Sequence, residues 1–142
     1  MLNEEVRNIM TKDPIVVNPQ DLVKNVSKMM SDKKLQQIPV VDEEGKLMGI
    51  ITSYDLWKNL QESKEDGTQV VGDVMETNVL VIEPKDKVGT AAELFIDKRF
   101  KTLPVVNLDK KLKGVITAFD VISHVMKKEY PPHAILYKKI LD

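Results

Sequence analysis

The feature that most constrains this 142-residue chain is an internal duplication. When the sequence is shifted against itself by 65 positions, it matches without a gap over about 50 residues, of which about a third are identical. The matching segments include residues 6–10 with 71–75, residues 38–42 with 103–107, and residues 46–52 with 111–117. A match of this length predicts that one structural unit of about 60 residues is built twice.

Both copies show the same succession of hydrophobic patterns. A short apolar run predicts a strand, an Asp after a proline predicts a helix start, and apolar residues at helical spacing continue that helix. Two β-branched runs joined by a turn-forming loop then predict a hairpin, although the second loop lacks the glycine found at Gly45. The expected elements are a strand at 15–17 and 79–82, a helix from Asp21 and Asp86, a hairpin of 38–41 with 47–51 and its equivalent, and a second helix from about Thr52 and Thr117.

The repeated order strand–helix–strand–strand–helix predicts an α/β (α+β) fold. A single copy would leave the apolar face of its small sheet uncovered, so we expect the two copies to pack sheet to sheet around a shared core. The result would be one module with pseudo-two-fold symmetry. The expected parts are a first repeat at 1–61, a polar linker at 62–70, a second repeat at 71–130, and a C-terminal tail at 131–142 that docks on the module or on a neighbouring subunit.

Composition argues against several classes of function. The 21 basic and 22 acidic residues give a net charge of −1, without the basic excess that nucleic-acid binding favours. There is no cysteine, and His124 and His133 are too far apart to suggest a catalytic or metal cluster. We therefore expect no enzyme activity and no metal. The short apolar runs and acidic N-terminus predict no membrane span and a cytoplasmic location.

A Thr-x-x-Asp pattern stands at the expected start of the second helix in both copies, as Thr52 with Asp55 and as Thr117 with Asp120. One interpretation is a binding site, because a helix N-terminus favours phosphate and a carboxylate can accept hydrogen bonds from both hydroxyls of a ribose. The other interpretation is a capping box, which needs no ligand. The pattern alone favours the cap, and the two roles can coexist.

The repeated motifs resemble those of the cystathionine-β-synthase (CBS) domain family. They are the opening segments 9–11 and 74–76, the central segments 38–42 and 103–107, and the closing segments 49–55 and 114–120. The resemblance covers roughly residues 6–130 and implies a stand-alone CBS pair, or Bateman module. It implies a regulatory role in which AMP, ADP, ATP or S-adenosylmethionine binds and its occupancy is passed to another protein. It also implies a flat homodimer. Trp57 lies at a helical position, and we expect it to be a packing or dimer-contact residue.

The resemblance further implies two clefts, each combining the closing motif of one copy with the opening and central segments of the other. One cleft would use Thr117, Asp120, Val115, Ile15, Val16, Leu35, Gln36, Gln37 and Pro39. The other would use Thr52, Asp55, Ile50, Leu80, Val81, Phe100, Lys101, Thr102 and Pro104. Apolar members would hold the base, and Lys101, with Lys34 and Arg99 behind it, is the nearest cation for a phosphate.

The two expected clefts differ in polarity, since Gln36 and Gln37 face one while Lys101 and Thr102 face the other. We therefore expect them to differ in affinity or in preferred ligand. Two other functions stay open. One is a protein-interaction or structural CBS module that binds no ligand, and the other is nucleic-acid binding, which the near-neutral charge disfavours.

Overall fold

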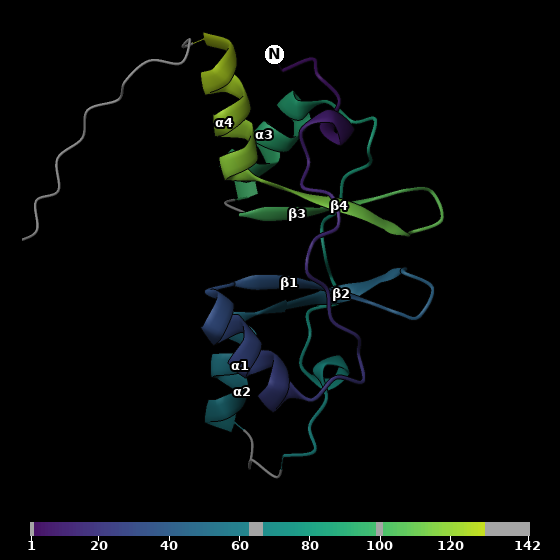
Figure 1. Ribbon diagram of the computed structural model, residues 1–142, viewed down its shortest axis with the longest axis vertical. Coiled ribbons are helices and arrows are strands. Elements are labelled where there is room, and N and C mark those ends of the chain that lie inside the picture. Colours follow the sequence, from purple (N-terminus) through teal and green to yellow (C-terminus); the bar gives the residue numbers. More distant parts are fainter. Residues whose placement is uncertain (1, 63–66, 99–100, 130–142) are drawn as a thin grey trace, which may run out of the picture.

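The computed structural model describes residues 2–62, 67–98 and 101–129. Each repeat folds into one antiparallel hairpin with a helix on either side of it in sequence, which confirms the expected fold class (Figure 1). In the first repeat these elements are α1 (Val23–Lys33), β1 (Gln37–Val41), β2 (Leu47–Thr52) and α2 (Ser53–Glu62). In the second they are α3 (Val88–Lys98), β3 (Thr102–Val106), β4 (Leu112–Thr117) and α4 (Ala118–Glu129). None of these helices is long and apolar enough to span a membrane.

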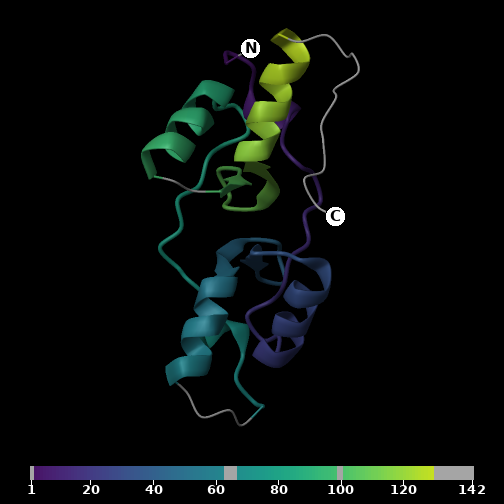
Figure 2. The ribbon, with the colours of Figure 1, turned by 90° about the vertical axis from the view of Figure 1, so that its left-hand side faces the viewer.

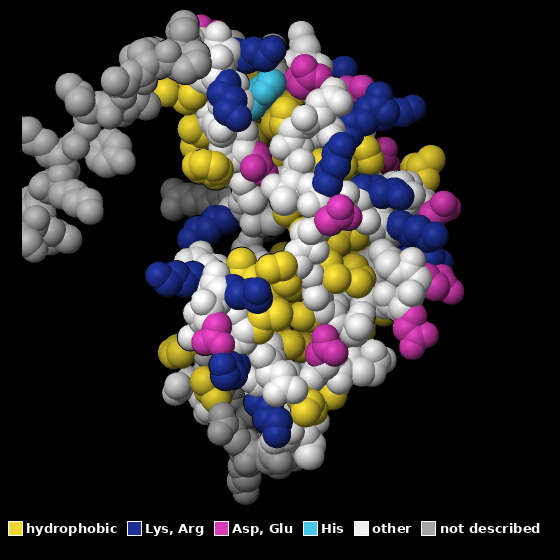
Figure 3. Space-filling view, in the orientation of Figure 1, with side chains coloured by type: hydrophobic (Ala, Val, Ile, Leu, Met, Phe, Trp, Pro, Cys, Tyr) yellow, Lys and Arg dark blue, Asp and Glu magenta, His cyan; other side chains and the backbone are white. Residues whose placement is uncertain are grey.

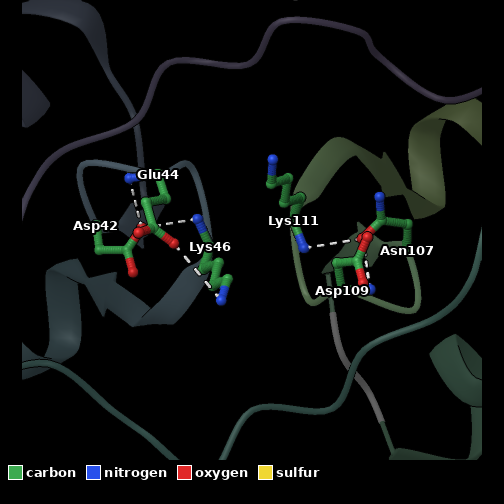
Figure 4. Close-up of polar contacts among 6 residues, drawn as sticks. All are labelled: Asp42, Glu44, Lys46, Asn107, Asp109 and Lys111. Atoms are coloured by element: carbon green, nitrogen blue, oxygen red, sulfur yellow. Dashed lines mark hydrogen bonds and ion pairs between the residues drawn. The ribbon is translucent and has the colours of Figure 1, made fainter.

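The two hairpins share the same register and the same irregularity. Gln37 pairs with Thr52 and Thr102 with Thr117, and each first strand has a bulge at its end. The second loop closes without glycine because Lys110 takes the left-handed conformation, with φ of 63°, where Gly45 has 83°. Figure 4 shows why both loops are stable: an oxygen of Asp42, or of Asn107, accepts two backbone N–H groups of its own loop at 2.8 to 3.0 Å.

The hairpin loops also join the two repeats. Lys46 and Lys111 form an antiparallel bridge, in which the N–H of Leu47 donates to the carbonyl of Lys110 at 2.9 Å and the N–H of Leu112 donates to the carbonyl of Gly45 at 3.0 Å. In Figure 1 the hairpins accordingly face one another at mid-height, with the helices of each repeat towards the opposite ends. Backbone pairing thus holds the module together at the side remote from the helices.

The opening segments of the two repeats are exchanged. Val6 begins a short 3-10 turn and is fully buried among residues of the second repeat, with its N–H donating to the carbonyl of Asp86 at 2.8 Å. Val71, its equivalent, is fully buried among residues of the first repeat and donates to the carbonyl of Asp21 at 2.9 Å. Each half is therefore completed by chain from the other repeat, and these crossing segments run along opposite edges of the module in Figure 2.

The expectation of one shared core is wrong, because most of the buried hydrophobic side chains form two clusters, one in each half. The cluster in the first half consists of Val17, Val26, Met30, Ile38, Val40, Ile51, Leu56 and Val71. The cluster in the second half consists of Val6, Ile82, Val88, Ala91, Phe95, Leu103, Val105, Ile116 and Val121. The exchange links the clusters, since each takes one valine from the other repeat. Residues 63–66 of the expected linker and the whole tail at 131–142 lie outside the described residues.

Two local expectations are also wrong. The opening strands at 15–17 and 79–82 shrink to single parallel bridges, Val17 with Val40 and Ile82 with Val105. They stop there because a turn follows at once, in which an oxygen of Asp21 accepts the N–H of Asn18 at 2.9 Å. That contact also explains the helix start: Asp21 closes the turn instead of capping the helix, so α1 begins later, at Val23. Asp86 does the same with Glu83 before α3.

Candidate functional site

Two cavities lie between the repeats, each bordered by chain from both. The first cleft has a volume of about 560 Å³, within the range of about 300–1,000 Å³ typical of small-molecule pockets. Its lining residues are Thr11, Asp13, Pro14, Ile15, Lys34, Leu35, Gln36, Gln37, Ile38, Pro39, Lys101, Thr102, Val115 and Thr117. The second cleft is smaller, at about 170 Å³, and is lined by Gln37, Ile50, Thr52, Asp55, Glu76, Asn78, Val79, Leu80 and Thr102.

Lysine and arginine side chains gather where the two halves meet. In Figure 3 the surface is hollowed at the left edge between the halves, and dark blue side chains border the hollow. Lys34 and Lys101 are the cations among the described residues that line the first cleft, and Asp13 is the one carboxylate there. The second cleft has Asp55 and Glu76 and no lysine or arginine among its described lining residues. The clefts are therefore opposite in electrostatic character.

Backbone pairing between the repeats builds one wall of each cleft. The N–H of Thr11 donates to the carbonyl of Val115 at 2.8 Å, and the N–H of Val115 returns a bond at 3.0 Å. Glu76 and Ile50 form the matching pair in the other cleft, at 2.8 and 2.9 Å. These bridges bring the chain after each 3-10 turn against the closing strand of the other repeat, as the family resemblance implies.

The bridges require a glycine beside them. A Cβ built at Gly114 would lie 2.6 Å from the carbonyl oxygen of Thr11, and one built at Gly49 would lie 2.6 Å from that of Glu76. Real Cβ atoms do not approach a backbone oxygen so closely. The glycine of each closing motif is thus explained by the close approach of the other repeat's backbone.

Both Thr-x-x-Asp motifs form capping boxes. The N–H of Thr52 donates to Asp55 Oδ2 at 3.1 Å, and the N–H of Asp55 donates to Thr52 Oγ1 at 3.0 Å. The pair Thr117 and Asp120 repeats this geometry at 2.9 and 3.0 Å. In each box the second carboxylate oxygen has no hydrogen bond among the described residues, and the threonine hydroxyl keeps its own proton to donate. Cap and ligand site are therefore compatible.

Most of the residues expected in the first cleft line it. Thr117, Val115, Ile15, Leu35, Gln36, Gln37 and Pro39 all do so. Val16 and Asp120 do not reach its wall, although the capping box ties Asp120 to Thr117.

The expected second cleft is only partly assembled. Thr52, Asp55, Ile50, Leu80 and Thr102 line it, whereas Val81 lines a neighbouring hollow with Met48 and Pro104 is buried. Lys101 lies on the wall of the first cleft instead, where its Nζ donates to Gln36 Oε1 at 3.3 Å. Arg99 and Phe100 lie outside the described residues.

Some lining residues were not predicted. Thr11 and Glu76 stand at equivalent places in the two opening motifs, and only the exchange of segments brings them into the clefts. Gln37 and Thr102, also equivalents, line both clefts and so form the wall between them. The side-chain oxygen of Gln37 is buried there with no hydrogen-bond partner among the described residues. Within the same part of the chain, no group of His, Asp and Glu side chains is arranged to hold a metal ion.

The repeats are matched by a single family model, described as CBS domain, at residues 6–56 and again at 71–127. The chain belongs to the CBS domain family. With one match to each repeat, it is a CBS pair, and the family expected from the sequence is confirmed.

Curated relatives share the CBS pair within longer chains. Inosine-5'-monophosphate dehydrogenase of Methanocaldococcus jannaschii is 34% identical over 126 residues, which are 89% of this chain and 24% of that enzyme. The chloroplastic CBS domain-containing protein CBSX1 of Arabidopsis thaliana is 31% identical over 147 residues, covering 82% of this chain and 62% of that protein. This chain spans less than two thirds of either relative. The likeness to the dehydrogenase concerns its CBS region, and a CBS pair is a regulatory, non-catalytic module.

Solved structures show the same fold. The crystal structure of CBSX2 in complex with AMP matches with a TM-score of 0.78 and 32% identity, covering 88% of this chain and 98% of that one. The CBS domain pair of protein MJ0100, in complex with 5'-methylthioadenosine and S-adenosyl-L-methionine, matches with a TM-score of 0.74 and 26% identity, covering 89% of this chain and 98% of that one.

Proposed function

We propose that this CBS pair is a ligand sensor that binds an adenosine-containing compound in its first cleft. The observation that carries the proposal is the cleft itself, a cavity of about 560 Å³ whose walls come from both repeats. The complexes of CBSX2 with AMP and of MJ0100 with methylthioadenosine and S-adenosylmethionine support this class of ligand. Among AMP, ADP, ATP and S-adenosylmethionine, the lysines of the first cleft favour a phosphorylated compound.

The walls of the first cleft match the three parts of such a ligand. Ile15, Pro39 and Val115 offer an apolar sandwich for the base, while the backbone of Ile15 has no hydrogen bond to another described residue and is free to read the base edge. Asp120 has a second carboxylate oxygen for the ribose hydroxyls.

The phosphate would lie at the N-terminus of α4. That helix begins at Ala118, directly after Thr117. The N–H groups of Ala118 and Asp120 already donate to the carbonyl of Lys101 and to Thr117 Oγ1, so it is the positive end of the helix dipole that favours an anion there. The Thr117 hydroxyl adds a donor, and Lys101 on the facing wall adds a charge.

A ligand that contacts both repeats could change how the two halves are arranged, and this change would be the signal. Its binding would favour the arrangement of the two halves that closes the first cleft, and only to the extent that it binds this arrangement better than an open one. The hairpin bridge between Lys46 and Lys111 would then serve as the fixed side about which the cleft narrows.

Exposed apolar side chains support a homodimer. Exposed apolar side chains lie at equivalent places on the second helix of each repeat: Tyr54, Trp57 and Leu60 on α2, and Phe119, Ile122 and Met126 on α4. Both helices lie on the face shown in Figure 2. A second copy related by a two-fold axis would cover both stripes with the same two stripes, as an isologous interface requires. The cytoplasmic location expected from the sequence stays a prediction.

Calorimetric titration with AMP tests the ligand proposal. We expect saturable binding to the wild type, weaker binding of 2'-deoxy-AMP, which lacks one ribose hydroxyl, and a loss of at least about tenfold in AMP affinity in Asp120→Asn. The Asn side chain keeps an oxygen for the capping box but loses the charge. Asp32→Asn on the exposed face of α1 is the matched control and should bind AMP normally.

Failure of AMP, ADP, ATP and S-adenosylmethionine to bind the folded protein would contradict the proposal. That result would favour the ligand-free interaction module instead. Salt-dependent retention of RNA or DNA would revive the nucleic-acid alternative.

A further inference from the structure

A broad hollow of about 620 Å³ lies on the second half, beside the first cleft. It is bordered by the opening segment of the first repeat, the turn before α3 and the hairpin of β3 and β4. Among the described residues, neither α2 nor α4 contributes to it, so it is separate from the apolar stripes of those helices. Its lining residues are Arg7, Asn8, Met10, Lys12, Asp13, Pro84, Asn107 and Lys113.

The hollow is opposite in charge to the equivalent surface of the first half. Its lining has three cations and one carboxylate, a net charge of +2. The residues 65 positions away in the repeat have two carboxylates and no cation, a net charge of −2. Because the two repeats fold in the same way, the fold itself does not require the cations. The first-half equivalents are Gly72, Asp73, Met75, Thr77, Asn78, Pro19, Asp42 and Met48.

Two of the three cations in the hollow are available to a partner. Lys12 and Lys113 are exposed and have no ion pair among the described residues. Arg7 is held by Glu5 at 2.8 Å and keeps further N–H groups of its guanidinium to donate. Met10 and Pro84, both partly buried, add apolar surface. Such a lining is complementary to a protein segment that carries acidic side chains.

The hollow and the first cleft share a wall, which is the segment from Thr11 to Asp13. Thr11 lines the first cleft, Lys12 lines the hollow, and Asp13 lines both. Asp13 also has a left-handed backbone, with φ of 51°, whereas its equivalent Asn78 does not. This conformation is uncommon for a residue other than glycine, and such positions concentrate at ligand clamps and switches.

We propose that the hollow binds an acidic segment of the protein that this CBS pair regulates, and that residues 11–13 link its affinity to occupancy of the first cleft. The proposal rests on the proposed function of that cleft. A ligand that contacts Thr11 and Asp13 would hold Lys12 in place between them, so the acidic segment would not have to order it. Ligand and acidic segment should therefore strengthen one another's binding by the same factor.

Fluorescence anisotropy with a labelled poly-L-glutamate peptide tests the surface. The wild type should bind the peptide, with an affinity that falls as salt is raised. The double variant Lys12→Thr with Lys113→Met gives the hollow the residues of its first-half equivalents, and should bind the peptide at least about fivefold more weakly. The control Lys24→Thr with Lys33→Met removes the same charge from exposed positions of α1 and should bind nearly as tightly as the wild type.

The same titration with saturating AMP tests the link. AMP should tighten peptide binding to the wild type by at least about twofold, and calorimetry should show the same gain in AMP affinity when the peptide is saturating. The hollow variant should still bind AMP, because neither Lys12 nor Lys113 lines the first cleft. Thermal unfolding verifies that both double variants are folded.

The outcomes separate this inference from the proposed function. Equal peptide affinity in the two double variants would overturn the docking surface. Tighter binding of single-stranded oligothymidylate than of the peptide, through the same two lysines, would make nucleic acid the partner and would also overturn it. Peptide affinity that AMP leaves unchanged or weakens, in a protein shown to bind AMP, would overturn the link. Absence of any AMP binding would contradict the proposed function, while the peptide titration would still decide on the surface.

Discussion

At two positions of this CBS pair, the close approach of the other repeat's backbone explains which residue is present. Gly114 and Gly49 leave room for the carbonyl oxygens of Thr11 and Glu76, and the bridges formed there line the clefts. A side chain at either glycine would act on fold and site together.

Gly114→Ala should lower the free energy of unfolding by about 1–3 kcal/mol, because its Cβ must displace the backbone of Thr11. Gly89→Ala is the control: a Cβ there would lie no closer than 3.3 Å to Leu2, so its effect should be smaller. Denaturant unfolding measures both. Equal stability of Gly114→Ala and the wild type would show that the first bridge is looser than described.

The sequence predicts only some of the residues that line the clefts. The capping box of Thr117 and Asp120 was predicted because a helix start with Thr-x-x-Asp is a local pattern, and the ligand role of the two residues stays a prediction. Glu76 and Thr11 were missed because their role depends on pairing with a strand about 25 to 105 residues away, which no local pattern encodes. Lys101 was predicted to line the second cleft, but it lines the first.

Among the elements, the exchanged opening segments have the largest consequences. Each segment is only a short 3-10 turn, yet it supplies a fully buried valine to the opposite half. The folding unit therefore differs from the sequence repeat: the half that contains α3 and α4 needs the first residues of the chain.

Val6→Ala should destabilise the half with α3 and α4, by about 1–3 kcal/mol for the buried methyl groups lost. Hydrogen exchange would show faster exchange first in α3 and α4, while α1 and α2 stay protected. Val71→Ala is the reciprocal variant, with the opposite pattern expected. If hydrogen exchange became faster in α1 and α2 of Val6→Ala instead, that result would contradict the assignment of Val6 to the second half.

Hairpins and helices were well predicted, because their hydrophobic periods and the loop residues are local signals. The opening strands were overestimated, since an apolar run cannot reveal that the turn at Asn18 limits the pairing of Val17 to one bridge. The helix start at Asp21 was misplaced because the same carboxylate serves a turn or a helix cap equally well.

In the whole molecule, the hairpin loops and the helices lie on opposite sides and have different roles. The hairpin loops pin the repeats together at one side, and the helices stand at the other, where α2 and α4 expose their apolar stripes (Figure 2). A second copy on that face would bring the closing helices of four repeats together. Changes in the clefts would then reach the second copy through α2 and α4, which begin directly after Thr52 and Thr117.

Trp57→Asp should convert the proposed dimer to a monomer, because it buries a charge in the middle of the α2 stripe. Trp57 is 58% exposed in the single chain, and Ile96 on α3 is 76% exposed but outside the stripes. Ile96→Asp is thus a control that should stay dimeric. Sedimentation measures both masses. A wild type that is monomeric at high concentration would contradict the two-fold interface.

In the proposed function, one adenosyl ligand binds both repeats in the first cleft. Hydrogen exchange with and without saturating AMP tests it most directly, because exchange is measured segment by segment. We expect added protection in residues 11–15 and 34–39 of the first repeat together with residues 115–120 of the second. Protection confined to one repeat, or its absence at saturation, would contradict it.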